Sequence, residues 1–145
     1  MRKMIVLLSM LSLCLATLAG GITGNDSEEV AAAVKAFVKH ADKQDLTKMD
    51  ALLHKEYRTV VNRLFGSEEV SIMDKSTYLS LMKEGKVGGD KRKVKIGEIK
   101  IIGNNAMVEA TFTGEKLVFE TFLQLAKDVS GEWKIISDFP KIAQI

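Results

Sequence analysis

Apolar residues in the first third of the chain recur with the period of an α-helix. The positions that this spacing would bury are Val30, Val34, Phe37, Val38 and Ala41. Glu29 lies three residues after Asp26, so these two residues can form a capping box, with Ser27 as an alternative N-cap. Together, the spacing and the cap predict an amphipathic helix that ends near Asp42.

Two shorter helices are expected further along the chain. Asp45 can cap the first of them, whose apolar residues lie at helical spacing from Leu46 onward. The second is expected to start near Lys75 and to end near Glu84, because Gly85 can adopt the left-handed conformation that closes many helices. All three expected helices therefore precede residue 90.

Strands are expected from two kinds of pattern. Residues 57–65 are rich in β-branched and aromatic side chains, which predicts a strand between the second and third helices. After residue 93 the apolar period becomes two, which is typical of half-buried strands. The four expected strands cover residues 94–102, 106–113, 117–126 and 133–140, the last ending at the only proline, Pro140. A change of facing near Gly97 predicts a β-bulge in the first of these four.

This order of elements predicts the fold class. Helices that precede a run of strands indicate an α+β fold, and the short turns between the last four strands require antiparallel pairing. The chain has 145 residues and neither an internal repeat nor a linker. We therefore expect a single domain over residues 28–142, after a flexible leader at residues 22–27.

The beginning of the chain has the pattern of an export signal. Met1–Lys3 is basic, Met4–Leu18 is apolar, and Ala19–Gly21 supplies the small residues that a signal peptidase requires. The apolar run is shorter than the roughly 20 residues that span a bilayer. We expect residues 1–21 to be a cleaved signal peptide, which predicts a periplasmic or extracellular protein. Cys14 follows a leucine and lies inside the apolar run, so lipid attachment there is not expected.

Charge and cysteine content narrow the range of functions. The chain has 21 basic and 19 acidic residues, and loss of Arg2 and Lys3 with the signal peptide would leave 19 of each. A neutral domain gives no reason to expect nucleic-acid or anionic-membrane binding. The basic cluster at Lys91–Lys95 is expected to be a solvated turn and strand start. Because Cys14 is the only cysteine, its removal would exclude disulfides and thiol catalysis.

Few residues are candidates for acid–base chemistry. The two histidines, His40 and His54, are expected at solvated helix ends. Strand alternation places Glu109, Glu120 and Asp138 on the outer surface of the sheet, although a register shift of one residue would reverse this. No spacing of a metal site or cofactor motif is present. The sequence therefore predicts no catalytic residue, metal or cofactor.

Five polar or aromatic residues are candidates to line a ligand pocket. Thr121 and Ser137 alternate in phase with apolar neighbours, Tyr57 and Tyr78 could extend hydroxyl groups into the same space, and Trp133 could form a flat wall. A few polar groups on an apolar lining would suit a small planar ligand. The alternative is that the aromatic residues are simply packed in the core and that threonine is a normal strand residue.

Several segments resemble a known family. Tyr78–Met82, Gly85–Gly89, Leu125–Lys127 and Gly131–Ile136 occur in the order and spacing typical of the nuclear transport factor 2-like superfamily, and resemble its putative lumazine-binding family. The similarity covers residues 28–142. The resemblance implies a cystatin-like (also called SnoaL-like) cone, in which a curved antiparallel sheet wraps round three helices and a mostly apolar cavity, often as a dimer. It implies no established reaction.

Three functions remain open at this point. The first is a binding or carrier module for a small apolar or aromatic molecule. The second is an isomerase or dehydratase, since superfamily members of that kind use an aspartate inside the cone. That function would require His54, Asp138 or Glu109 to face inward. The third is a protein-interaction module, in which apolar residues such as Phe122 on the outer sheet face form a homodimer.

Overall fold

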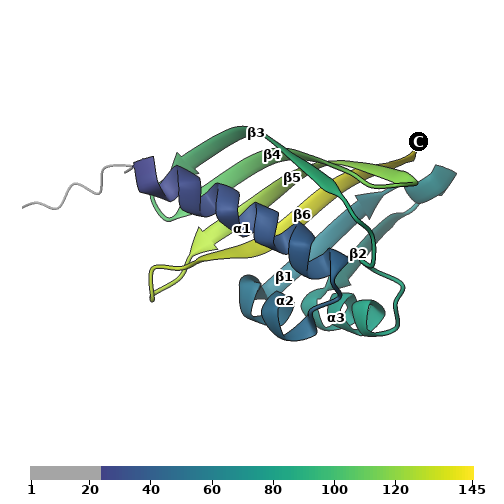
Figure 1. The fold of residues 1–145 in the computed structure, drawn as a ribbon, viewed down its shortest axis with the longest axis horizontal. Helices are drawn as coiled ribbons and strands as arrows, with labels where there is room; N and C mark the ends of the chain where they lie inside the picture. Colours follow the sequence, from purple (N-terminus) through teal and green to yellow (C-terminus); the bar gives the residue numbers. More distant parts are fainter. Residues whose placement is uncertain (1–23) are drawn as a thin grey trace, which may run out of the picture.

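In the computed structural model, which describes residues 24–145, three helices pack against one six-stranded sheet (Figure 1). The helices are α1 (Gly24–Asp42), α2 (Leu46–Leu52) and α3 (Lys75–Lys83), with a 3-10 turn η1 (Leu64–Gly66). The strands are β1 (Leu53–Asn62), β2 (Val70–Asp74), β3 (Lys93–Ile102), β4 (Asn105–Thr113), β5 (Leu117–Lys127) and β6 (Trp133–Gln144). The α+β prediction is confirmed; the predicted signal peptide, including Cys14, lies outside the described residues.

The sheet has the order β2-β1-β6-β5-β4-β3. The pairs from β3 to β6 are antiparallel, as predicted from their short turns. In contrast, β1 pairs with β6 in parallel, so the sheet is mixed. In Figure 1, α1 crosses one face of the sheet, while α2 and α3 lie together at the end formed by β1 and β2. This arrangement brings residues from both halves of the chain to the inner face.

The first helix supplies much of the core through the predicted stripe. Val30, Val34 and Ala41 have no exposed surface, and Phe37 is 2% exposed. The helix begins at Gly24, before the predicted cap, so Asp26 lies in the first turn and does not cap it. Its carboxylate instead forms an ion pair with Lys127 of β5 at 2.5 Å, which fixes the beginning of α1 to the sheet.

The second helix begins as predicted but ends at Leu52, one residue before the last apolar position expected in it, and the third helix covers the predicted residues. Asp45 caps α2 by accepting a hydrogen bond from the amide of Lys48 at 3.1 Å. Asp74 caps α3 in the same way, from the amide of Thr77 at 2.8 Å. After α3, Gly85 has a φ of 74°, the left-handed conformation expected of it.

The first two strands differ from the prediction. β1 begins at Leu53, four residues before the predicted start, and ends at Asn62 because Arg63 adopts a left-handed φ of 56°. The sequence did not predict β2 at all. Its residues are almost all exposed, and among the described strands it pairs with β1 alone, so it lacks the buried apolar face of a half-buried strand.

The last strand continues past Pro140, where it was predicted to stop. The final residue pair between β1 and β6 joins Thr59 to Asp138, so beyond that point β6 is paired only with β5. A proline is tolerated where one side of a strand has no partner, because its missing N–H then breaks no hydrogen bond. β6 therefore extends to Gln144.

A bulge in β6 reverses the facing of its second half. Ile135 pairs with Leu125 and Ser137 pairs with Gln124, so Ile136 is an extra residue in the ladder. Before the bulge Ile135 is fully buried; after it Asp138 is 7% exposed and Phe139 is 48% exposed. The predictions that Asp138 faces outward and that Ser137 and Phe139 face inward were therefore wrong.

The neighbouring strands keep the predicted alternation. β3 has its predicted bulge between Ile96 and Ile99. In β4 and β5, Glu109 and Glu120 are exposed on the outer face, as predicted. Phe122 lies on that same outer face, opposite Glu109 and 50% exposed. Within residues 24–145, no helix is both long and apolar enough to cross a membrane.

Candidate functional site

A cavity of about 300 Å³ lies between the inner face of the sheet, α3 and the loop that joins α3 to β3. Its apolar walls include Phe37 of α1, Val61 of β1, Phe112 of β4, Phe119 of β5, and Pro140 and Ile142 of β6. Four polar residues with side chains less than 10% exposed also line it, namely Thr59, Tyr78, Arg92 and Asp138. The volume matches the lower range of small-molecule sites, roughly 300–1,000 Å³, and the lining has the usual composition of such sites.

Asp138 is the buried acid of this cavity. The bulge turns it inward, where the hydroxyl of Thr121 donates a hydrogen bond to its Oδ1 at 2.5 Å. On the other side, Thr59 is its direct neighbour in the parallel pair with β1 and is 3% exposed. Burial raises the pKa of Asp138 to about 6, against the opposing effects of the Thr121 hydrogen bond and the Arg92 charge. The group can therefore hold or release a proton near neutral pH.

Three aromatic rings pack against one another at the α3 side of the cavity, and two of them, Phe37 and Tyr78, line it. Tyr78 stacks on Phe37 with ring centroids 6.1 Å apart and meets Tyr57 edge-on at 5.4 Å. Burial raises the pKa of both tyrosine hydroxyls, so both remain protonated at neutral pH. The hydroxyl of Tyr57 has no hydrogen-bond partner within the described part of the chain. Tyr78 lines the cavity, and Tyr57 packs behind it.

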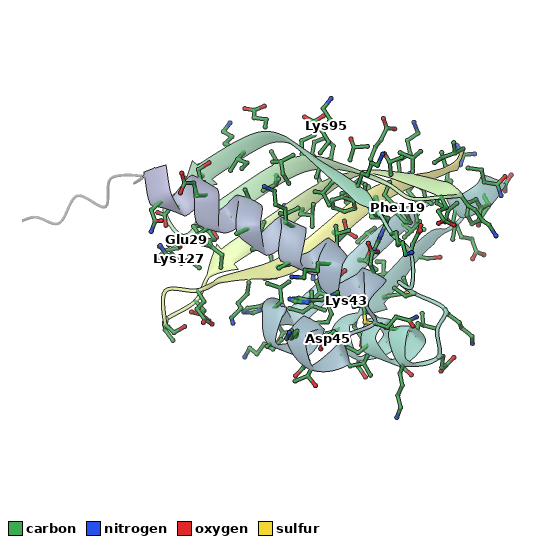
Figure 2. All side chains as sticks on the ribbon, viewed as in Figure 1. Glu29, Lys43, Asp45, Lys95, Phe119 and Lys127 are labelled. Atoms are coloured by element: carbon green, nitrogen blue, oxygen red, sulfur yellow. The ribbon has the colours of Figure 1, made fainter. Side chains whose placement is uncertain are left out.

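Arg92 is the buried cation of the cavity. Its Nε donates to Asp42 Oδ1 at 2.6 Å, and its backbone amide donates to Asp42 Oδ2 at 2.9 Å. The guanidinium also lies 5.3 Å from the centroid of the Phe119 ring, which is labelled in Figure 2. The side chain is only 9% exposed, so the prediction of a solvated basic cluster was wrong at this position. The missed signal is that Arg92, which directly precedes β3, alternates in phase with Val94 and Ile96 of that strand.

The five predicted ligand residues lie in different places. Tyr78 lines the cavity, Thr121 contacts Asp138, and Tyr57 supports Tyr78. Trp133 does not line it: the residue is 5% exposed and lies under the Lys127 ammonium at 5.5 Å. Figure 2 shows Lys127 near Glu29 at the start of α1, and Trp133, which contacts Lys127, belongs to the hydrophobic core.

Ser137 also does not line the cavity. It pairs with the exposed Gln124 of β5 on the outer face, because the bulge at Ile136 precedes it. Its inward facing was predicted by uninterrupted alternation, which a bulge breaks. The residues that sequence reasoning did not assign to the site are Thr59, Arg92 and, as an inward group, Asp138.

The other titratable candidates lie away from the cavity. His54 belongs to β1, not to a helix end, and its Nδ1 accepts a hydrogen bond from the Glu56 amide at 3.1 Å. His40 lies in the last turn of α1, where burial lowers its pKa. Neither histidine lines the cavity. In the part of the chain that the structure describes, no three His, Cys, Asp or Glu side chains are grouped as metal ligands would be.

Comparison with known proteins gives the family and the fold. The sequence profile of the family described as "Putative lumazine-binding" matches residues 25–139. No curated protein matches the chain. An NTF-2 like protein of unknown function from Silicibacter pomeroyi is similar in structure, with a TM-score of 0.71, 15% identity, and coverage of 82% of this chain and 97% of its own.

Two further solved structures have the same fold. A protein of unknown function with a cystatin-like fold from Nostoc punctiforme has a TM-score of 0.68 and 14% identity, covering 83% of this chain and 93% of its own. A ketosteroid isomerase-like protein from Erwinia carotovora atroseptica has a TM-score of 0.65 and 13% identity, covering 85% of this chain and 98% of its own. At these identities the likeness concerns the fold alone.

Proposed function

The chain belongs to the putative lumazine-binding family, and from this membership we propose that its cavity binds a small, mostly apolar molecule. The observation that carries the proposal is an apolar cavity of about 300 Å³ with one buried acid at its inner wall. Apolar walls supply affinity through desolvation, and a small number of polar groups orient the ligand. Asp138 suits that role, because its protonated form donates a hydrogen bond and its ionised form accepts one.

Export and dimerisation are parts of the same proposal. The basic, apolar and small-residue pattern of residues 1–21 supports a cleaved signal peptide, and hence a binding module outside the cytoplasm. On the outer sheet face, Phe122 lies opposite Phe139 in the pairing of β5 and β6, and both are about half exposed. Adjacent exposed aromatic residues among charged neighbours suit a homodimer interface.

Native mass spectrometry of the protein isolated from the envelope fraction of its host tests these points together. We expect a reproducible extra mass of small-molecule size on a chain cleaved near Gly21, and a twofold protein mass. In an Ile142→Trp variant the extra mass should be lost, because Ile142 is a partly exposed residue of the cavity wall and the larger ring would fill the space. The matched control is Ile72→Trp, which places the same ring at a 66% exposed site outside the cavity.

The outcomes separate the parts of the proposal. Extra mass that survives in the Ile142→Trp protein would place the ligand elsewhere and contradict binding in the cavity. Bare protein from the host, together with failure to take up any apolar compound in vitro, would contradict the binding function itself. An uncleaved chain would contradict export, and a strictly monomeric spectrum would contradict the dimer.

A second candidate function is proton transfer by Asp138. The specific observation is that this carboxyl group lines the cavity and has a pKa raised to about 6, close to the value that suits a general base at neutral pH. In this function Asp138 would remove a proton from a carbon next to a carbonyl group of the bound molecule and return it to another position. The ketosteroid isomerase-like neighbour has the same fold, which makes such a use of the cone physically possible.

Isotope exchange tests this second candidate. If Asp138 is a base, the protein in D₂O should exchange the acidic C–H protons of small cyclic ketones faster than buffer alone. Asp138→Asn should lower that rate by about 100-fold or more, because general-base contributions are of this size. Glu109→Gln, on the outer face, is the control and should leave the rate unchanged. Equal rates for the Asp138→Asn and unmodified proteins would exclude the proposed base.

A further inference from the structure

The guanidinium of Arg92 has hydrogen-bonding capacity that no described residue uses. Asp42 is its only carboxylate partner, and both oxygens of Asp42 are occupied, one by Nε and one by the backbone amide of Arg92. Nη2 is buried and has no hydrogen-bond partner among residues 24–145. The Arg92 side chain lines the cavity that also contains Asp138, and the buried Nη2 therefore lies at or just behind the wall of the candidate site.

A buried cationic donor is costly to leave without an acceptor. The cost of an unmade buried hydrogen bond is about 1–3 kcal/mol and is larger for charged groups. Arginine presents its donors in a rigid plane, so an acceptor placed correctly in the cavity would be bound with little further ordering. The ion pair with Asp42 and the contact with the Phe119 ring hold that plane in position. The guanidinium plane is therefore held in place before any ligand binds, with Nη2 still lacking an acceptor.

We propose that the molecule bound in the cavity carries a carboxylate group, which accepts a hydrogen bond from Nη2 of Arg92 while its apolar body packs against Phe119 and Phe112. This inference rests on the proposed binding function and specifies its ligand class. The apolar residues that line the same cavity would contact the rest of such a molecule.

An anionic acceptor is favoured over a neutral carbonyl for two reasons. Hydrogen bonds between ionised partners are roughly twice as strong as neutral ones, and burial strengthens them further. The cavity also limits the repulsion that an anion would meet. Asp138 is buried with a pKa raised to about 6, so an anion bound beside it would favour its protonated form. Lys86 at the wall is a second cation, paired with Glu84 at 2.7 Å. Asp90 is the remaining acid of the lining.

Three probes of nearly equal shape test this inference by isothermal titration calorimetry on the mature protein. They are naphthalene-2-carboxylate, naphthalene-2-carboxamide and naphthalene itself, all small enough for the cavity. We expect the carboxylate to bind roughly tenfold more tightly than the carboxamide, which corresponds to one charge-assisted hydrogen bond. In Arg92→Gln this preference should disappear. In Lys91→Gln, which removes the same charge from an exposed neighbour outside the cavity, the preference should persist.

A second measurement uses the unmodified protein, so it does not depend on the variant folding. The side-chain ¹⁵N resonances of Arg92 should shift when naphthalene-2-carboxylate is added and should not shift with naphthalene. Unmoved resonances at saturation, or a carboxylate preference that survives in folded Arg92→Gln protein, would overturn the inference. Naphthalene binding without any preference for the carboxylate would overturn it too, while leaving the binding function intact. If none of the three probes binds, the proposed binding function fails for this size of ligand, and the inference fails with it.

Discussion

Replacing Asp138 with asparagine is expected to stabilise the folded protein at pH 7, by up to about 3 kcal/mol. The reason is that the folded protein holds this carboxyl group with a pKa of about 6, above its ordinary value of 3.8, because burial disfavours the charged form. At neutral pH the ionised group therefore opposes folding, by an amount that follows from the difference in pKa at about 1.4 kcal/mol per unit. Asparagine has nearly the same shape, carries no charge and can still accept the hydrogen bond from Thr121.

The pH dependence of this effect has a definite sign. Below pH 3.8 Asp138 is protonated in both the folded and the unfolded chain, and it contributes nothing. Between about pH 4 and pH 6 the folded chain binds more protons than the unfolded chain, so the contribution of Asp138 becomes less favourable as pH rises. Above about pH 6 the contribution is constant. The stability difference between Asp138→Asn and the unmodified protein should follow this curve when measured by urea denaturation from pH 3 to pH 8.

Asp74→Asn is the matched control, because the same substitution at this position should lower the stability of the folded protein at pH 7 and not raise it. Asp74 caps α3, and hydrogen bonds from Thr77 lower its pKa in the folded protein. Its contribution is therefore favourable above its ordinary pKa of 3.8 and is lost as pH falls below that value. Asp74→Asn should thus destabilise the protein at pH 7, and this effect should shrink as pH falls below 3.8. A pH-independent effect of Asp138→Asn would show that the carboxyl group is not buried in the folded protein.

Gly88→Ala is expected to destabilise the protein by about 3 kcal/mol or more, through steric conflict and backbone strain together. Gly88 lines the cavity and has a φ of +79°, which an L-residue adopts only at a cost. A Cβ atom there would lie 2.0 Å from the backbone oxygen of Ala41, which cannot move away because it belongs to α1 and accepts a hydrogen bond from the Gly89 amide at 3.1 Å. The displaced loop would also disturb the nearby Arg92. The change in the free energy of unfolding can be measured by urea denaturation.

Gly131→Ala separates strain from steric conflict. Gly131 has a φ of +88°, similar to that of Gly88, but a Cβ atom there would meet no atom within 4 Å. Only the backbone cost of roughly 1–2 kcal/mol is expected for this variant. Equal destabilisation by the two substitutions would mean that the close approach of the loop to α1 does not exist in solution.

The local elements of the fold, and part of the candidate site, could be predicted from the sequence. The three helices follow from apolar spacing and caps such as Asp45, because each involves only neighbouring residues. The meander from β3 to β5 follows from alternation and short turns, and it placed Thr121 correctly on the inner face. Tyr78, predicted as a ligand residue, does line the cavity. The family resemblance added the expectation of a cone with a cavity, which no periodicity by itself contains.

Only the tertiary structure decided which face of β6 carries the acid. Alternation along a strand shows which residues share a face, but not whether that face is the inner or the outer one. One extra residue, Ile136, therefore reverses the facing of every later position without any change in the local pattern. The position of that bulge depends on pairing with two strands at once, and one of them, β1, is far away in the sequence and parallel. The burial of Arg92 has a similar cause, because its partner Asp42 is 50 residues away. Periodicity and caps are local and therefore readable in the sequence, whereas the meeting of Asp138 and Arg92 in one cavity depends on long-range pairing.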